Sequence, residues 1–250
     1  MTEGAAEALL ELQRLTERLR RECPWDREQT AATIVPHTVE ESYEVADAAL
    51  AGDDEKLLDE LGDLLFQVYF LALLLQERGH GDLESAARLI HEKLVRRHPH
   101  VFGDVVAKTG ERVKANWERI KREQEGREGV FHEVPETLPA LLLARKVQQR
   151  AKSVGFEYPD LDGAVADLDD EIRELKADWS AEELGDVLFA AVNVARKLDV
   201  DPELELRRAT ARFRNRVEIA EELARANGED WTALPLEQQD RYFDLAKETE

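Results

Sequence analysis

The sequence predicts an all-α protein built from two similar helical domains. Apolar residues recur at helical spacing almost throughout the chain, and runs that alternate apolar with polar residues, as strands do, are absent. A set of acidic and basic motifs also occurs twice in the same order. The 250 residues are enough for two domains of about 125 residues each.

Composition and charge narrow the classes of protein to which the chain can belong. Hydrophobic residues make up 43% and charged residues 36%, which is typical of a soluble helical protein. A net charge of −21 argues against nucleic-acid binding. Cys23 is the single cysteine, so an internal disulfide is excluded and a cytoplasmic setting is expected. No signal peptide is visible, and the apolar stretch at residues 64–75 is too short to span a membrane.

Helix breakers divide the periodic segments in order along the chain. The first helix is predicted from Leu9, Leu12, Leu15 and Leu19 and ends before Cys23-Pro24. Further boundaries are expected at Gly52-Asp53, Gly79-His80-Gly81, His98-Pro99 and Gly103. Residues 124–139 contain two glycines and two prolines and lack an apolar stripe. We therefore expect an N-terminal domain at 1–123, a linker at 124–137 and a C-terminal domain at 138–250.

The two sides of this linker resemble each other. An acidic segment at residues 39–45 precedes a second one at 59–66, and the pair recurs at 168–175 and 182–189. A basic segment follows in each half, at residues 92–97 and again at 211–216. The shared order indicates an internal duplication, at a period far longer than that of a solenoid repeat.

The carboxylates of the first half predict a metal site. Glu41 and Glu44 lie three residues apart, as do Glu60 and Asp63, so each pair shares one helix face. A turn near residues 51–54 allows the two helices to run antiparallel, so that the pairs face each other. Four carboxylates crowded on apolar helices repel strongly unless a hard divalent cation neutralises them. Mg²⁺ fits this role and also binds phosphates.

Other interpretations of these residues were weighed. With 55 acidic residues, a single such pair is most simply an exposed helix face, but here the pairing recurs and leads into an apolar helix. A di-iron site needs two Glu-x-x-His motifs on core helices, whereas Glu77 to His80 spans Gly79 at a helix end. His98 and His100 flank Pro99, which favours a structural turn over a pair of metal ligands. Cys23 lacks an evident base partner for nucleophilic catalysis.

The motifs together resemble a known family, the all-α nucleoside triphosphate pyrophosphohydrolases, and within it the two-domain MazG proteins. Two segments carry the acidic pattern, Glu-Glu-x-x-Glu at 40–44 and Glu-x-x-Asp at 60–63. The resemblance extends from about residue 9 to 247 through further motifs: Cys23-Pro24-Trp25-Asp26, Arg96-Arg97-His98-Pro99-His100-Val101-Phe102, Trp117-Glu118, Leu138-Pro139-Ala140-Leu141 and Val154-Gly155-Phe156.

This resemblance implies a fold, a reaction and a ligand set. It implies tandem four-helix-type bundles that assemble as homodimers and hydrolyse nucleoside triphosphates to the monophosphate and pyrophosphate. Mg²⁺, with Mn²⁺ as a substitute, would be held by Glu41, Glu44, Glu60 and Asp63, and in the second half by Glu171, Glu174, Glu183 and Asp186. Glu41 or Glu171 would orient or deprotonate the attacking water. No nucleic-acid or membrane partner is expected.

The resemblance also implies a set of nucleotide-binding residues. Lys93 with Arg97, and Arg212 with Arg216, would neutralise phosphate oxygens. Trp117 and Phe243 would stack on the base, with Lys121 and Lys247 in the same binding set. For Trp25 and Phe156, packing in the core is the favoured role.

The halves differ in ways that bear on which of them works. Fifteen residues separate Glu44 from Glu60, but eight separate Glu174 from Glu183, so the second connection is tight, with Ser180 and Glu183 forming a capping box. Asn193 lies seven residues after Asp186, where the first half has Phe70. Because an amide suits contact with a nucleotide, the second half is favoured as the working site. The alternative is a catalytically silent nucleotide-binding or dimerisation protein.

Overall fold

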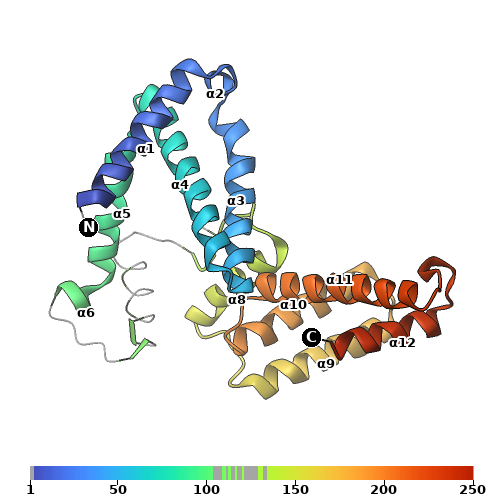
Figure 1. Cartoon of the computed structure of the whole chain (residues 1–250). Helices are drawn as coiled ribbons and strands as arrows, with labels where there is room; N and C mark the ends of the chain where they lie inside the picture. Colours follow the sequence, from blue (N-terminus) through green and yellow to red (C-terminus); the bar gives the residue numbers. More distant parts are fainter. Residues whose placement is uncertain are drawn as a thin grey trace. The chain divides into compact units, whose positions relative to one another are not determined.

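The computed structural model describes residues 3–103 and 134–249, together with positions 109, 110, 112, 113, 116, 120 and 129–131. This part of the chain contains helices and no strand, which confirms the all-α class (Figure 1). It divides into two compact units, residues 1–126 and 127–250, which are described separately below. The domain and linker limits expected from the sequence stay a prediction. No helix in the described residues is long and apolar enough to cross a bilayer.

Most helices of the first unit begin and end at the expected breakers, but the break at Gln29 and Thr30 was not expected. Its elements are α1 (Glu3–Glu22), α2 (Pro24–Glu28), α3 (Ala31–Ala51), α4 (Asp54–Glu77), α5 (Leu83–Arg97) and α6 (Pro99–Phe102). Pro24 and Pro99 occupy the first positions of α2 and α6, where a missing N–H costs nothing. Arg20 of α1 forms a two-pronged ion pair with Glu77 at the end of α4, with N–O distances of 2.8 and 2.9 Å.

The helices α3 and α4 form an antiparallel hairpin that positions the acidic pairs (Figure 1). Thr30 and Thr33 form a capping box at the start of α3, and Gly52 ends the helix at φ 71°, a left-handed conformation that favours glycine. The Asp53 side chain then accepts a hydrogen bond from the Lys56 N–H at 3.0 Å and so begins α4. The hairpin reverses the chain within two residues.

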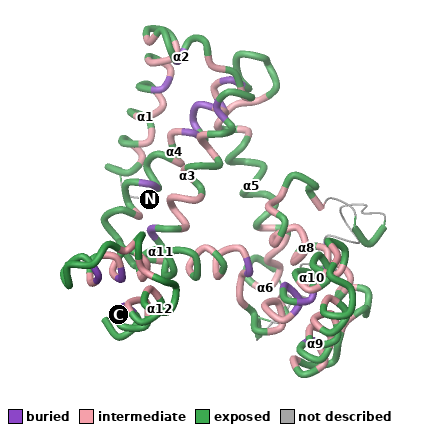
Figure 2. Tube along the Cα trace, turned by 90° about the vertical axis from the view of Figure 1, so that its right-hand side faces the viewer, coloured by how far each residue is buried: buried purple, intermediate pink, exposed green. Residues whose placement is uncertain are grey.

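The second unit repeats the hairpin with shorter helices. Its elements are α8 (Ala140–Ser153), α9 (Leu161–Ala177), α10 (Ala181–Lys197), α11 (Pro202–Ala226), the 3₁₀ turn Trp231–Ala233 and α12 (Leu236–Lys247). The hairpin is made by α9 and α10, α8 packs on α10, and α12 packs on α11. Buried positions appear as short stretches of these helices, between longer exposed ones (Figure 2).

The short spacing between Glu174 and Glu183 does not come from the tight loop that the sequence predicts. The first turn comprises Gly52 and Asp53 and the second comprises residues 178–180, so the loops are of similar length. The helices differ: α3 continues from Glu44 to Ala51, whereas α9 ends at Ala177, soon after Glu174. The second set of carboxylates therefore lies closer to its turn, and Glu183 lies in the first turn of α10.

Candidate metal centre and the adjoining pocket

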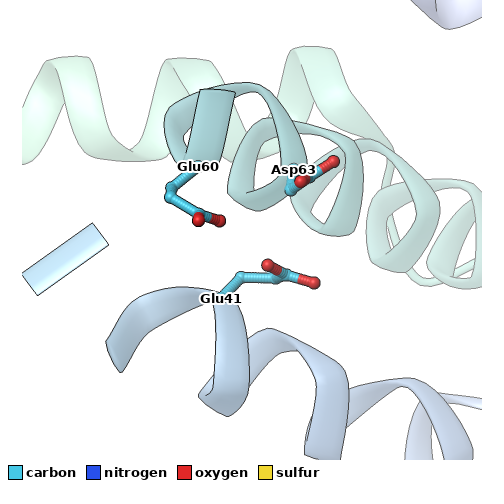
Figure 3. Close-up of side chains that lie close together, drawn as sticks. All are labelled: Glu41, Glu60 and Asp63. Atoms are coloured by element: carbon cyan, nitrogen blue, oxygen red, sulfur yellow. The ribbon is translucent and has the colours of Figure 1, made fainter. Parts of the chain in front are cut away.

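The hairpin of the first unit brings three carboxylates together. Glu41 of α3 and both Glu60 and Asp63 of α4 each offer an oxygen, and these oxygens lie within 4.8 Å of one another. Figure 3 shows Glu41 facing Glu60 across the space between the helices, with Asp63 one turn further along α4. Glu60 is only 6% exposed, whereas Asp63 is exposed. The facing arrangement expected for these three residues is therefore present.

Glu44 interacts electrostatically with the other carboxylates of this cluster. Burial raises the pKa of Glu41, and the charges of Asp63 and Glu44 raise it further. Burial also raises the pKa of Glu60, which shares a hydrogen bond with Glu44. Lys56 lies 3.6 Å from a Glu60 oxygen and offsets only part of this effect. The four predicted ligands of the first half therefore interact as one group.

The hairpin of the second unit forms an equivalent cluster. Glu171 and Glu174 of α9 and Glu183 of α10 each offer an oxygen within 4.8 Å of the others. Burial raises the pKa of Glu171, followed by the charges of Asp186 and Glu174. Burial likewise raises the pKa of Glu183, followed by Glu174 and Asp186. Asp186 thus acts on the cluster electrostatically, although it is not one of the three closely grouped residues.

The side chain of Glu183 does not form the capping box that the sequence predicts, and its position suits a bound cation. Its N–H donates to the Ser180 hydroxyl at 3.2 Å, so Ser180 is the N-cap of α10. The return bond of a capping box is not made: the Glu183 Oε2 atom is buried and has no hydrogen-bond partner in the described structure. The side chain instead joins the carboxylate cluster. A buried carboxylate oxygen without a donor, among other carboxylates, suits a hard cation.

Most of the other predicted site residues lie within the described residues, on helices of both units. Lys93 is exposed on α5 and Arg97 lies in the last turn of that helix. On α11, Arg212 is exposed and Arg216 is half-buried. Phe243 lies 5.6 Å from Phe213, measured between ring centroids, and the Lys247 ammonium lies 5.0 Å from the Phe243 ring. Trp117 and Lys121 lie outside the described residues.

Two aromatic residues depart from the expected core role. Phe156 is 81% exposed and Trp25 is 53% exposed, so neither packs in the core of its unit. Phe156 lies in the connection between α8 and α9, whereas Trp25 is the second residue of the short helix α2. Trp25 contacts the His37 ring edge-on, at 6.1 Å between centroids. The exposed ring of Phe156 lines a pocket in the second unit.

This pocket has a volume of about 640 Å³ and lies between α8, α9 and α10. Its aromatic lining comes from Phe131, Phe156, Tyr158 and Phe189, and its polar lining includes Gln148, Asn193 and Arg196. Asp167 also lines it, four residues before Glu171 and thus one helical turn from the metal cluster. Asn193 was predicted from the sequence, whereas Gln148 and Arg196 were not. Their position depends on how α8 packs on α10.

The first unit differs at the positions that correspond to this pocket, and its opening of about 700 Å³ lies instead beside the hairpin turn, at Asp53, Lys56 and Glu60. Phe70, at the position that matches Asn193, is fully buried and forms a core with Ile34 and Leu74. Its ring packs edge-on against Phe66, at 5.9 Å between centroids. The cavity between α1 and α4 has a volume of about 10 Å³, too small for an organic ligand.

Comparison with known proteins gives consistent matches. Residues 29–102 match the family model of the MazG nucleotide pyrophosphohydrolase domain. The nucleoside triphosphate pyrophosphohydrolase of Escherichia coli (strain K12) is 41% identical, over 91% of this chain and 91% of that protein. The nucleoside triphosphate pyrophosphohydrolase/pyrophosphatase MazG of Thermotoga maritima is 41% identical, over 90% and 89%. A solved structure of a mazG-related protein from Thermotoga maritima is 32% identical, covers 47% of this chain and 99% of that chain, and gives a TM-score of 0.41.

Proposed function

Since the chain belongs to the MazG family of nucleotide pyrophosphohydrolases, we propose that it hydrolyses nucleoside triphosphates to nucleoside monophosphate and pyrophosphate. The observation that supports this most directly is the pair of carboxylate clusters, each formed across a helical hairpin. Oxygen ligands in this number favour Mg²⁺, with Mn²⁺ as a substitute.

We assign metal binding and water activation to the residues of the second cluster. Glu171, Glu174, Glu183 and Asp186 would hold the metal, which when bound would supply Lewis-acid polarisation of the phosphates. Glu171 would orient a water for in-line attack at the α-phosphorus and accept its proton. In the metal-free protein, burial and the charges of Asp186 and Glu174 raise the pKa of this carboxylate, and a bound cation would offset that shift. Glu41 has the corresponding position and the same direction of pKa shift in the first cluster.

We assign the working site to the second unit. Both units group their carboxylates, so the metal cluster alone does not separate them. The lining of the adjoining openings does. The opening of about 700 Å³ beside Glu60 in the first hairpin is lined mostly by charged residues of its turn. The opening of about 640 Å³ at the second hairpin is lined by four aromatic rings, and Phe70 fills the matching position in the first unit. Under this proposal the first unit contributes to homodimer assembly, and the protein serves to clear unwanted nucleotides in the cytoplasm.

The experiment that tests the proposal measures pyrophosphate release from a panel of nucleoside triphosphates in the presence of Mg²⁺. The wild-type chain should release pyrophosphate, Glu174→Gln should lower kcat at least about a hundredfold, and Glu44→Gln should retain most activity. An equal loss in both variants would overturn the assignment to the second unit. If the wild-type chain binds nucleotides but turns none of them over, it is the silent binding protein instead.

A further inference from the structure

We infer that Lys56 is a built-in counter-ion of the first carboxylate cluster, and that it makes this cluster a weaker metal site than the second. The two clusters of one chain then take up a divalent cation in a fixed order, the second before the first. This order rests on the proposed function, in so far as metal binding is assigned there to both clusters.

The ammonium of Lys56 lies beside a predicted metal ligand. Lys56 precedes Glu60 by one turn of α4, and its Nζ atom is 3.6 Å from the Oε1 atom of Glu60. Figure 3 shows the carboxylate of Glu60 between the two helices, facing Glu41. Lys56 also lines the opening of about 700 Å³ beside the hairpin turn, and its side chain is 53% exposed. A positive charge is therefore already present at the edge of the first cluster before any metal binds.

The second cluster has no such cation. Among the described residues, no lysine or arginine forms an ion pair with one of its carboxylates. The charged neighbours that act most strongly on Glu183 are all acidic: Glu174, Asp186, Asp178 and Glu182. The Oε2 atom of Glu183 is buried and has no hydrogen-bond partner in the described structure. The negative charge of the second cluster is therefore not offset by the protein itself.

The lengths of the hairpin helices explain this difference. The helix α4 begins at Asp54, so Glu60 lies in its second turn and a side chain one turn earlier can reach it. The helix α10 begins at Ala181, so Glu183 lies in its first turn. The residue four positions before Glu183 is Trp179, which precedes the helix, is 79% exposed and has no charge. The shorter second hairpin thus lacks the helical position that holds Lys56 in the first.

The presence or absence of this counter-ion changes metal affinity because binding compares the metal-bound protein with the metal-free one. In the first cluster, Lys56 stabilises the metal-free state and repels an incoming cation. Repulsion between a univalent and a divalent cation a few ångströms apart is worth roughly a tenfold change in affinity, even at the dielectric constant of water. In the second cluster, a cation gives the buried Glu183 oxygen the partner that it lacks. The second cluster should therefore fill at the lower metal concentration.

Calorimetric titration of the metal-stripped, nucleotide-free chain with Mn²⁺ tests this order without turnover. We expect a tight and a weak class of site, the tight class weakened by Glu174→Gln and the weak class by Glu44→Gln. Lys56→Met should lower the Kd of the weak class roughly tenfold and leave the tight class unchanged.

Two control variants separate charge from other effects of the substitution. Lys56→Arg keeps the positive charge and should keep the wild-type Kd of the weak class. Arg18→Met removes an exposed ion pair with Glu22, one turn apart on α1, and should change neither class. Circular dichroism checks that every variant is folded.

The outcomes distinguish the role of Lys56 from the proposed reaction. If the chain hydrolyses no triphosphate but Lys56→Met tightens the weak class, the order of filling stands and the reaction fails. If triphosphates are hydrolysed and Lys56→Met changes neither class, the reaction stands and the role of Lys56 is overturned. A tight class that is lost in Glu44→Gln, a single class of site, or no Mn²⁺ binding would also overturn the order.

Discussion

Glu41, Glu60, Glu171 and Glu183 are held close to other carboxylates, and both burial and the charges of those neighbours raise their pKa. Such crowding costs stability in the absence of a cation, because like charges are brought together in partly buried positions. Glu60 is 6% exposed and shares a hydrogen bond with Glu44, so it experiences both burial and repulsion. We expect such crowded carboxylates to lower the stability of the metal-free protein and to raise its affinity for a metal ion.

The Glu60→Gln variant tests whether the crowded carboxylates lower the stability of the metal-free protein. Removing one negative charge should leave the melting temperature in a chelator equal to or above that of the wild type. Adding Mg²⁺ should raise the wild-type melting temperature by several degrees, because a ligand that binds only the folded state stabilises it. The rise should shrink in the variant. Thermal scans with and without Mg²⁺ measure it, and an undiminished rise would place the metal elsewhere.

Glu157 gives the opposite case, in which a carboxylate is stabilised by cations. Hydrogen bonds and charge from Arg196 and Lys197 lower its pKa from 4.5 to about 2. A lowered pKa stabilises the fold above the unfolded-state value, and this contribution is lost as the pH falls from about 4.5 toward 2. Glu157→Gln should therefore cost about 2 kcal/mol at pH 7 and flatten the fall in stability over that pH range.

Urea denaturation at a series of pH values measures the effect. The matched control is Glu237→Gln, which removes an exposed ion pair with Arg241 and should change stability by less than about 0.5 kcal/mol. Equal losses in the two variants would contradict the assigned role of Glu157.

Helix boundaries in this protein are set by local chemistry. Thr30, Asp53 and Ser180 each accept a backbone hydrogen bond at the start of a helix, and Gly52 ends α3 in a left-handed conformation. Because prolines, glycines and capping side chains act within a few residues, the breakers in the sequence predicted most of these boundaries, although not the one at Thr30. The lengths of the hairpin helices, which set how far each cluster lies from its turn, were not predicted by the same signals.

Two glycines of the first hairpin should respond to alanine in opposite directions. Gly52→Ala should destabilise the protein by about 1 kcal/mol, because φ at this position is 71°. Gly62 lies inside α4 with open space where a Cβ would be, so Gly62→Ala should stabilise by up to about 1 kcal/mol. Urea denaturation of both variants provides the comparison. The same sign of change in both would show that packing outweighs the backbone preference.

The contacts that create the pocket join distant parts of one unit. Gln148 reaches the carbonyl of Phe189 across 41 residues, and Arg196 reaches Glu157 across 39. Spacing along the sequence indicates which residues share a helix face, so Glu171, Glu174 and Asn193 were predictable. It does not indicate how α8 packs on α10, and Gln148 therefore had no distinguishing signal.

The division of the chain into two compact units predicts that each folds alone. Separate chains of residues 1–126 and 127–250 should both be helical and unfold cooperatively. Only the second should bind a nucleoside monophosphate, because its pocket is open and Phe70 fills the matching position of the first. Circular dichroism and calorimetry on the two fragments test this. A second fragment that unfolds while the full chain stays folded would show that the units stabilise each other.

The buried ring of Phe70 has a practical consequence for inhibitor design. Each hairpin groups its acids, so a chelating compound has two places to act on one molecule. A planar heterocycle fits the opening beside Phe189, which is lined by aromatic rings, whereas Phe70 fills the matching position of the first unit. Joining such a heterocycle to a chelating arm would give a compound that tells apart two duplicated halves of the same polypeptide.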